Sequence, residues 1–550
     1  MNNQLRPLKQ SSCRAAFMLA LVFSAVVPPQ RAAAQDEPLA PRRAENRNGP
    51  WFGIERPPAP GAEPAVVVGT RAPRPVRVPA TAPAGREFEA AALRADLTTI
   101  VGFAEESRAL KEIGSGQQWG RVSGFPSGAK TIDWAAAQFR QAGIADVRVQ
   151  SIAQDARAAF WLPLSWEVTL LGDPAFGPGS SDIVLASAIP VPPSEIPGGT
   201  LTAPLVFVGG ANPSLVEHLD VKGKIAVQLT IPQGHMLFER AAVTGRAQAL
   251  MKRGAVAVFT LIRLPGNELG RDFSNCGGPC VNIGGRDGLF LEQVLDRAAQ
   301  AGASDKLRAR IRLQTQTFRN LSAKNAVAVI PGSRSRETVI VDAHGDAWFD
   351  GAGDNADGYS VMLALARHFA KPANRPERTL VFVASAGHHT PGINGPRAFV
   401  AANPDLAGNA VLMLNVEHVA QRNFSAARTT ASDGYRQAVA DSGEAPVYAG
   451  IVNRSPFLNR LFEQGVVDYG VNFISQQSNM QSGETGGFGG LNEAALVTVM
   501  QAPPLYHTTG EGLDVISTPG LERMARFLAH FVREVSKAPL ADLKTVAAAR

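Results

Sequence analysis

The 550-residue chain has few cysteines, little net charge beyond its first 90 residues and no long internal hydrophobic run. Three cysteines are too few to staple a chain of this length, so the fold has to rest on buried cores. Residues 1–90 hold 12 Lys and Arg against 7 Asp and Glu, which accounts for +5 of the net charge of +6. The rest of the chain is nearly neutral and offers no basic surface for phosphates, so we expect no nucleic-acid partner.

Two enzyme signatures are missing from the sequence as well. No Gly-x-Ser-x-Gly elbow follows a strand-like run, which excludes a serine hydrolase of that type. The glycine-rich turns lack the strand, helix and later acid of a dinucleotide-binding fingerprint. What is present is 45% hydrophobic and 19% charged residues, a composition typical of a globular protein with large cores.

The N-terminal region has the pattern of an export signal over residues 1–34. Basic residues precede an apolar run at 15–27, and three alanines at 32–34 offer a cleavage site. The run is shorter than the about 20 residues of a membrane-spanning helix, so anchoring through this segment is the alternative interpretation. We expect a mature protein with no stable membrane span, located in the periplasm or secreted. Residues 35–90 are rich in Pro, Ala and Arg and predict a linker.

The mature chain keeps two cysteines, because Cys13 leaves with the signal. Cys276 and Cys280 lie close enough in sequence to form a local disulfide in an oxidising compartment. The alternative is half of a metal site, for which Asp272 is the nearby acid. We expect the disulfide.

Folded structure is predicted from about residue 91, where helix-like spacing of apolar residues begins. Residues 195–320 alternate short buried strands with helices. Residues 321–540 repeat a strand, loop, helix order, and 541–550 form a tail. This alternation predicts an α/β fold with a mostly parallel sheet flanked by helices, and ligands bind such sheets beyond the carboxyl ends of the strands.

Four polar residues fall at or after predicted strand ends. His344 follows a buried run, Asp354 comes ten residues later in a glycine-rich turn, Glu417 ends an apolar strand, and His507 follows another. A buried, unpaired carboxylate such as Glu417 would be costly unless it met a cation or a donor. Each residue alone has an ordinary structural explanation, but four of them in this order favour a metal site.

These residues and their motifs resemble the zinc-dependent exopeptidase family that contains bacterial aminopeptidases and glutamate carboxypeptidase. The resemblance covers residues 91–194 and 321–540. Residues 195–320 resemble an inserted protease-associated domain, through the stretches 220–226 and 254–258. The resemblance implies a zinc exopeptidase-like α/β fold interrupted by that insert.

The resemblance also implies two zinc ions that share Asp354. His344 and Glu417 would complete one site, His507 would contribute to the other, and Asp346 would orient His344 by hydrogen bonding. Glu417 stands where the family usually has Asp, and it still supplies a carboxylate.

The sequence departs from the family after residue 384, where two adjacent glutamates are expected, a general base and a zinc ligand. Aligned without gaps, these positions hold His389 and Thr390. His389 could act as the base, because a neutral imidazole accepts a proton near pH 7. Alternatively, His388 or His389 could bind the second ion, and a ligand could not also be the base. Threonine is a poor ligand, so we expect one or two zinc ions.

Three further features near the site are ambiguous. His418 follows Glu417 directly, and because successive strand residues point to opposite faces, we expect it to be structural. The glycine-rich stretch 483–490 lies where the family has a substrate-facing loop. Trp348 would either line a pocket or cover it.

We therefore expect an exported zinc-dependent exopeptidase, of aminopeptidase or carboxypeptidase type, that hydrolyses peptides with metal-activated water. The alternative is a catalytically impaired protein of the same fold that binds peptides without cleaving them. Metal content separates the two. The sequence does not reveal which peptide terminus is recognised, nor the oligomeric state.

Overall fold

The computed structural model describes residues 51–543 except 58, 61–65, 69–74, 211–215, 232–235, 429–434, 452–454, 478–482, 492–493 and 502–504. These residues belong to one compact unit, Asn48–Arg550. The expected signal peptide lies outside the described residues, as do the first part of the expected linker and most of the tail. Among the described residues, none of the helices combines the length and apolar character needed to cross a membrane.

A mixed eight-stranded sheet forms one half of the fold, in the order β20-β19-β21-β16-β13-β15-β12-β3. Its central strands β21, β16, β13 and β15 are parallel to one another, whereas β19, β12 and β3 join through antiparallel pairs. The predicted α/β fold is confirmed. The strands are β3 (Asp146–Ala153), β12 (Ser322–Ile330), β13 (Thr338–His344), β15 (Thr379–Ser385), β16 (Ala410–Glu417), β19 (Val447–Ile451), β20 (Phe473–Gln477) and β21 (Ala495–Gln501).

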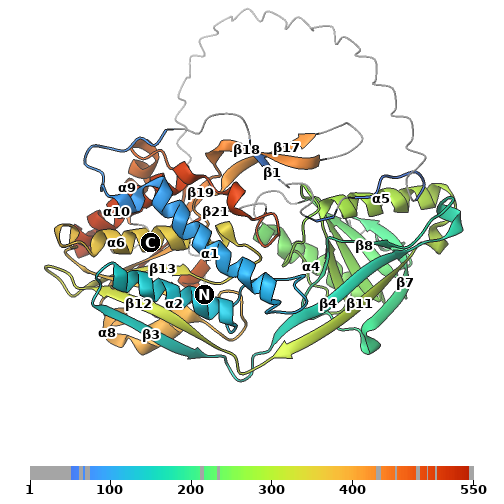
Figure 1. The fold of residues 1–550 in the computed structure, drawn as a ribbon, viewed down its shortest axis with the longest axis horizontal. Helices are drawn as coiled ribbons and strands as arrows, with labels where there is room; N and C mark the ends of the chain where they lie inside the picture. Colours follow the sequence, from blue (N-terminus) through green and yellow to red (C-terminus); the bar gives the residue numbers. More distant parts are fainter. Residues whose placement is uncertain are drawn as a thin grey trace, which may run out of the picture. The chain divides into compact units, whose positions relative to one another are not determined.

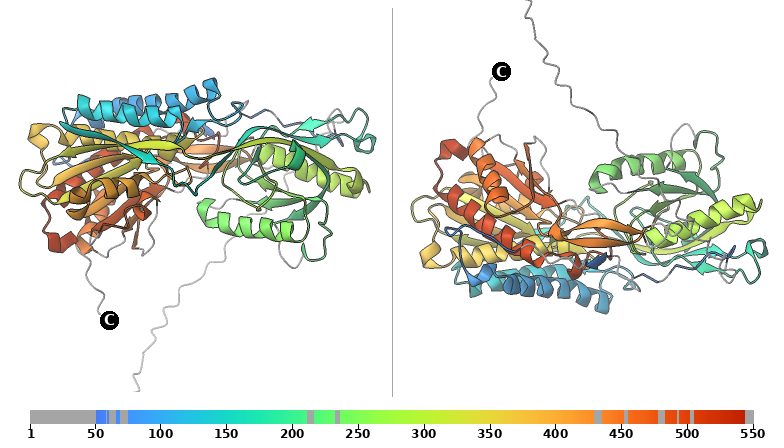
Figure 2. Two further views of the ribbon diagram at one scale, coloured as in Figure 1. Left: turned by 90° about the horizontal axis from the view of Figure 1, so that it is seen from below. Right: turned by 90° about the horizontal axis from the view of Figure 1, so that it is seen from above.

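Helices cover both faces of this sheet because alternate strand residues point to opposite sides (Figures 1 and 2). In β15, Leu380 and Phe382 pack with the larger helical layer, while Val381 and Val383 pack on the other side. The larger layer contains α1 (Ala90–Leu110), α2 (Pro126–Gln141), α6 (Asp357–Phe369), α9 (Pro456–Val467) and α10 (Thr518–Lys537), and the smaller one α7 (Gly395–Ala402) and α8 (Pro404–Gly408).

Several of these helices begin at polar residues that cap them. The side chain of Ser517 accepts a hydrogen bond from the backbone N–H of Gly520 at the start of α10, and Asn394 does the same for Arg397 at the start of α7. A proline stands in the first turn of each. These residues satisfy N–H groups that have no partner within the helix, which fixes where each helix starts.

A second eight-stranded sheet forms the other half, in the order β5-β4-β11-β7-β8-β9-β10-β6 (Figure 1). Helix α5 packs on one face and α4 on the other. The sheet begins at Phe160, so this lobe takes strands from both sides of the boundary expected at residue 195. Its elements are β4 (Phe160–Leu171), β5 (Ile183–Val184), β6 (Ala188–Pro190), β7 (Thr200–Gly209), β8 (Ile225–Thr230), α4 (Met236–Lys252), β9 (Ala257–Ile262), β10 (Cys280–Ile283), α5 (Gly285–Gln300) and β11 (Arg308–Phe318).

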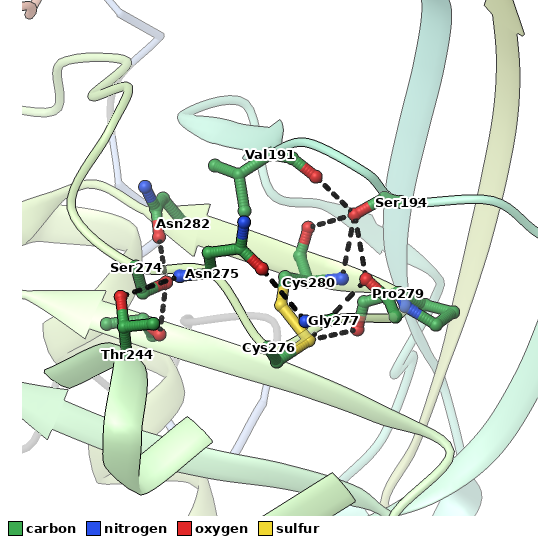
Figure 3. Close-up of a disulfide and its surroundings, with 12 residues drawn as sticks. Val191, Ser194, Thr244, Ser274, Asn275, Cys276, Gly277, Pro279, Cys280 and Asn282 are labelled. Carbon is green, nitrogen blue, oxygen red and sulfur yellow. Dashed lines mark hydrogen bonds between the residues drawn. A yellow bond between two sulfur atoms is a disulfide. The ribbon is translucent and has the colours of Figure 1, made fainter. Parts of the chain in front are cut away.

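The loop between β9 and β10 contains the expected disulfide, from Cys276 to Cys280 (Figure 3). The hydroxyl of Ser194 accepts a hydrogen bond from the backbone N–H of Cys280 at 2.9 Å. Ser274 bonds to the side chain of Asn282 on β10 at 2.8 Å. The loop is therefore tied to the second sheet, and with both cysteines paired they do not form half of a metal site.

Two small sheets and one short helix complete the fold. β1 (Val66–Val68) pairs with β18 (Tyr435–Glu444), which pairs with β17 (Arg422–Arg428), and β2 (Gly120–Arg121) pairs with β14 (Ala347–Trp348). Helix α11 spans Leu540–Leu543.

Candidate active site

The polar residues singled out in the sequence meet at the carboxyl ends of the central parallel strands. His344 is the last residue of β13 and Glu417 the last of β16. His388 and His389 follow the end of β15, and His507 follows β21. Because these strands run in the same direction, their ends share one edge of the sheet, and the side chains converge there.

Asp354 lies at the centre of this group and is fully buried. It comes from the short turn Ala352–Ala356 that leads into α6. Its Oδ1 lies 3.3 Å from Nε2 of His344 and 3.1 Å from Nε2 of His418. Its Oδ2 lies 2.9 Å from Nε2 of His389 and 2.9 Å from Nε2 of His507. One carboxylate thus faces two separate groups of imidazoles.

The first group consists of His344, Asp354, Glu417 and His418, whose donor atoms lie within 4.8 Å of one another. Oε1 of Glu417 is 3.8 Å from Nε2 of His344 and 3.3 Å from Nε2 of His418. Its Oε2 accepts a hydrogen bond from the amide of Asn415 at 2.7 Å. The side chain of His418 was expected to point to the opposite face of the strand, and that expectation was wrong. His418 has a φ of 51°, and its side chain turns toward the site.

The second group consists of Asp354, His389 and His507. The rings of the two histidines meet edge to face, with centroids 4.6 Å apart. Nδ1 of His507 donates a hydrogen bond to Oδ2 of Asp272 at 2.7 Å. Asp272 comes from the disulfide-bonded loop of the second lobe, so that lobe contributes directly to the surroundings of the site.

Beside both groups, His388 and Glu484 form a pair. Nδ1 of His388 hydrogen-bonds to Oε1 of Glu484, and its ring stacks on His344 with centroids 4.1 Å apart. Glu484 belongs to the glycine-rich turn Gly483–Gly486. In the sequence, this stretch is notable only because it lies where the family has a substrate-facing loop. The hydroxyl of Thr390 instead donates to the carbonyl of Ser123 at 2.8 Å, away from the histidines.

Asp346 connects these elements through the backbone. Its carbonyl accepts a hydrogen bond from Nδ1 of His344 at 3.0 Å, while its carboxylate lies 3.6 Å from the same nitrogen. The carboxylate oxygens accept the backbone N–H groups of His388, at 3.3 Å, and His389, at 3.0 Å. Asp346 therefore contacts His344 through its backbone carbonyl and also fixes the turn that presents the two later histidines.

Buried Arg121 holds the loop between His344 and Asp354. Its guanidinium donates to the carbonyls of Gly345, Asp350 and Gly351 at 3.1, 2.6 and 3.0 Å. Burial lowers the pKa of Arg121 to about 10, although the nearby carboxylates of Asp354 and Asp346 oppose the shift. It stays charged at neutral pH.

Trp348 lies in the same loop and is buried. The guanidinium of Arg271, from the second lobe, stacks over its ring at 3.7 Å. The ring of Trp348 is therefore packed between the two lobes.

The charges of the site depend strongly on one another. Burial alone would raise the pKa of Asp354, but His389 and His418 hold it well below its ordinary value. Burial disfavours a charged His418, yet Asp354 and Glu417 raise its pKa to about 10. Burial lowers the pKa of His389 to about 4 against the opposing effect of Asp354. Burial would likewise raise the pKa of Glu417, but His344 and His418 hold it well below its ordinary value. Asp354 and Glu417 are therefore ionised and attract positive charge to the centre.

Several buried atoms at the centre are placed to bind a cation. With Nδ1 donating to a carbonyl or carboxylate, His344 and His507 each direct the lone pair of Nε2 at an oxygen of Asp354. Nε2 of His344, Nε2 of His418 and Oδ1 of Asp354 have no hydrogen-bond partner among the described residues. Imidazole and carboxylate are the ligands of zinc, so these residues fit the ions that the resemblance implies.

Comparison with known proteins agrees with this geometry. The sequence model of Peptidase family M28 matches residues 325–532. A probable glutamate carboxypeptidase of Arthroderma benhamiae is 36% identical over 98 residues, which cover 17% of this chain and 13% of that protein. A probable glutamate carboxypeptidase of Arabidopsis thaliana is 28% identical over 200 residues, covering 34% of this chain and 26% of the other. The chain thus matches only a minor part of these relatives.

Solved structures show the same fold over most of the chain. A zinc aminopeptidase from Bacillus subtilis has a TM-score of 0.54 at 18% identity, covering 84% of this chain and 98% of that one. A Peptidase M28 precursor from Shewanella amazonensis has a TM-score of 0.56 at 17% identity, covering 81% and 96%. Residues 325–532 thus match the sequence model of Peptidase family M28, and the chain shares the fold of these solved structures.

Proposed function

We propose that this protein is an exported zinc-dependent exopeptidase that hydrolyses peptides at a chain end. The observation that supports it most is the placement of Asp354, whose two oxygens face two separate groups of histidine nitrogens. When bound, zinc ions would polarise the scissile carbonyl and lower the pKa of the attacking water. We propose His344, Asp354 and Glu417 as ligands of one ion, and Asp354 and His507 as ligands of the other.

The position of His389 favours a ligand role over the base role considered from the sequence. Its Nε2 faces the same oxygen of Asp354 as Nε2 of His507 does, and a nitrogen used in this way cannot also accept the proton of water. We therefore assign His389 to the second ion and the proton-accepting role to His388. Because Nδ1 of His388 is bonded to Glu484, the ring is fixed in direction and Nε2 remains to take up a proton.

Export rests on two observations. The N-terminal 34 residues have the pattern of a signal peptide, and the disulfide between Cys276 and Cys280 needs an oxidising compartment to persist. We propose a periplasmic or secreted protein whose partner is a peptide substrate.

A peptide-binding protein without hydrolysis is the second candidate. It is favoured by the absence of a glutamate at positions 388 to 390, where histidines and Thr390 stand instead. In that case the groups around Asp354 would hold metal but the protein would release no product.

The two candidates are separated by zinc content and turnover of the purified protein, measured with peptides blocked at either the amino or the carboxyl terminus. Hydrolysis predicts zinc binding, cleavage of one blocked series only, and loss of zinc and turnover in His389→Ala. His530→Ala is the matched control, because His530 lies on α10, pairs with Gln464 and belongs to neither group of candidate ligands. Zinc-loaded protein that cleaves neither series would refute hydrolysis and favour the binding candidate.

A further inference from the structure

We propose that His418 is a fourth protein ligand in the group of His344, Asp354 and Glu417, so that the two metal positions differ in kind. The first position is enclosed by four side chains. The second, formed by Asp354, His389 and His507, has three, so one position of a four-coordinate ion there would be left for solvent or substrate. The inference rests on the proposed function and deepens it, because it identifies which position faces the substrate.

The backbone directs His418 into the site. Glu417 and His418 are adjacent, and in a regular strand their side chains would point to opposite faces. His418 has a φ of 51°, a conformation that residues other than glycine adopt infrequently. Its N–H donates to the side chain of Asn355 at 3.2 Å, and its carbonyl accepts the N–H of Gln501 at 2.8 Å. The side chains of Glu417 and His418 thus both point toward Asp354.

A buried carboxylate holds this turn from the other side. Oδ2 of Asp357, in the first turn of α6, accepts the N–H groups of Val419 at 2.9 Å and Ala420 at 2.8 Å. Asn355 and Asp357 follow Asp354 closely in sequence. The segment that supplies Asp354 therefore also fixes the direction of His418.

The atomic separations agree with four ligands around one ion. Two ligands of a tetrahedral zinc site with bonds of about 2.0–2.2 Å lie about 3.3–3.6 Å apart. Nε2 of His418 is 3.1 Å from Oδ1 of Asp354 and 3.3 Å from Oε1 of Glu417. Nε2 of His344 is 3.3 and 3.8 Å from the same two oxygens.

Burial strengthens this reasoning. The side chain of His418 is only 1% exposed, and neither of its ring nitrogens has a hydrogen-bond partner among the described residues. Nε2 faces the carboxylate oxygens of Asp354 and Glu417 at 3.1 and 3.3 Å, so this nitrogen, and not Nδ1, is the one placed to bind an ion. A ligand role satisfies the nitrogen that faces Asp354 and Glu417.

The test compares zinc binding by the wild-type protein and His418→Phe, with a chelator of known affinity as competitor. His530→Phe is the matched control, because each histidine packs on a tyrosine ring, at 5.3 Å for His418 and Tyr506 and 5.5 Å for His530 and Tyr469. We expect a tight and a weaker zinc position in wild type. His418→Phe should lose more than the roughly 10- to 100-fold that removal of an outer partner costs, at the tight position only.

X-ray absorption of wild-type protein with one equivalent of zinc provides a measurement that needs no variant. The proposal predicts two imidazoles and no solvent around that first zinc. An unchanged tight affinity in a folded His418→Phe, a single imidazole in the spectrum, or a solvent ligand beside two imidazoles would overturn it. Turnover alongside either result would leave the proposed function intact, whereas a four-ligand site in a protein without turnover would refute the function alone.

Discussion

Asp272 is the contribution of the second lobe to the site, and its removal is the most informative single change. Its carboxylate accepts the hydrogen bond of His507 Nδ1 at 2.7 Å, from a position 235 residues away in sequence. The adjacent N–H of Arg271 donates to the carbonyl of His507 at 2.9 Å, and Gly270 pairs with Thr508. The loop therefore holds both the ring and the backbone of His507.

Asp272→Ala removes the acceptor that orients the ring of His507. The same acceptor makes Nε2 of that ring more basic, so this effect is lost too. Loss of such an outer partner costs about 10- to 100-fold in metal affinity, or about 1.4–2.7 kcal/mol. We expect Asp272→Ala to reach the upper part of this range, because the carboxylate also supplies negative charge. Asp272→Asn keeps an acceptor without the charge and should lose less. Both effects should be confined to the position formed by Asp354, His389 and His507.

The assay is zinc competition with a chromophoric chelator, together with kcat and KM for a cleaved peptide. Asp305→Asn is the matched control, because Asp305 is an exposed aspartate of the same lobe. A role in orienting His507 predicts a loss at one zinc position of two and a fall in kcat at full zinc occupancy. Equal zinc affinities in wild type and a folded Asp272→Ala would refute the reasoning.

Three further predictions follow from other contacts. Gly483→Ala should weaken zinc binding, because its new Cβ would lie 2.2 Å from Oε2 of Glu417. Gly486→Ala should leave zinc binding unchanged, because no atom lies within 4 Å of the Cβ it would add. Chelator competition compares the two variants. Glu87→Gln should cost about 1 kcal/mol at pH 7. Burial raises the pKa of Glu87, but Lys371 and other donors bring it below its ordinary value. The stabilisation that ionised Glu87 provides is therefore present above about pH 4.5 and vanishes as the pH falls through the lowered pKa. Melting curves of wild type and Glu87→Gln against pH would contradict this if the difference in melting temperature persisted in acid. Removal of zinc should lower the melting temperature, and zinc but not magnesium should restore it, because only the folded site binds the ion.

Much of the fold could be predicted because its central strands are continuous apolar runs. The segments that became β13, β15, β16 and β21 are buried on both faces, and such runs are visible in a sequence. Their carboxyl ends then indicated where His344, Glu417 and His507 would meet. The extent of the second lobe was harder to predict, because β4 and β11 pair across the 136 residues 172–307, and such pairing has no local signal.

The part of the site that sequence reasoning missed depends on single backbone angles and distant contacts. His418 enters the site through one left-handed residue that Asn355 and Asp357 hold in place, and strand periodicity cannot show such a turn. Glu484 reaches His388 from a glycine-rich turn 96 residues later in the chain. The adjacency of His388 and His389 was the available signal, since a one-residue shift of the gapless alignment places both at the site.

The distribution of charge explains why carboxylates that bond to the histidines should affect metal affinity more here than in a two-metal site whose ligands are mostly carboxylates. Two zinc ions carry four positive charges, whereas Asp354 and Glu417 supply two negative ones and each coordinating histidine is neutral. The remaining negative charge stands behind the imidazoles: Asp272 on His507, Glu484 on His388 and Asp346 near His344. Neutralising one of these three should therefore weaken metal binding although none of them is proposed to touch an ion. Of the three, Asp272 belongs to the second lobe, so that lobe would take part in holding the metal.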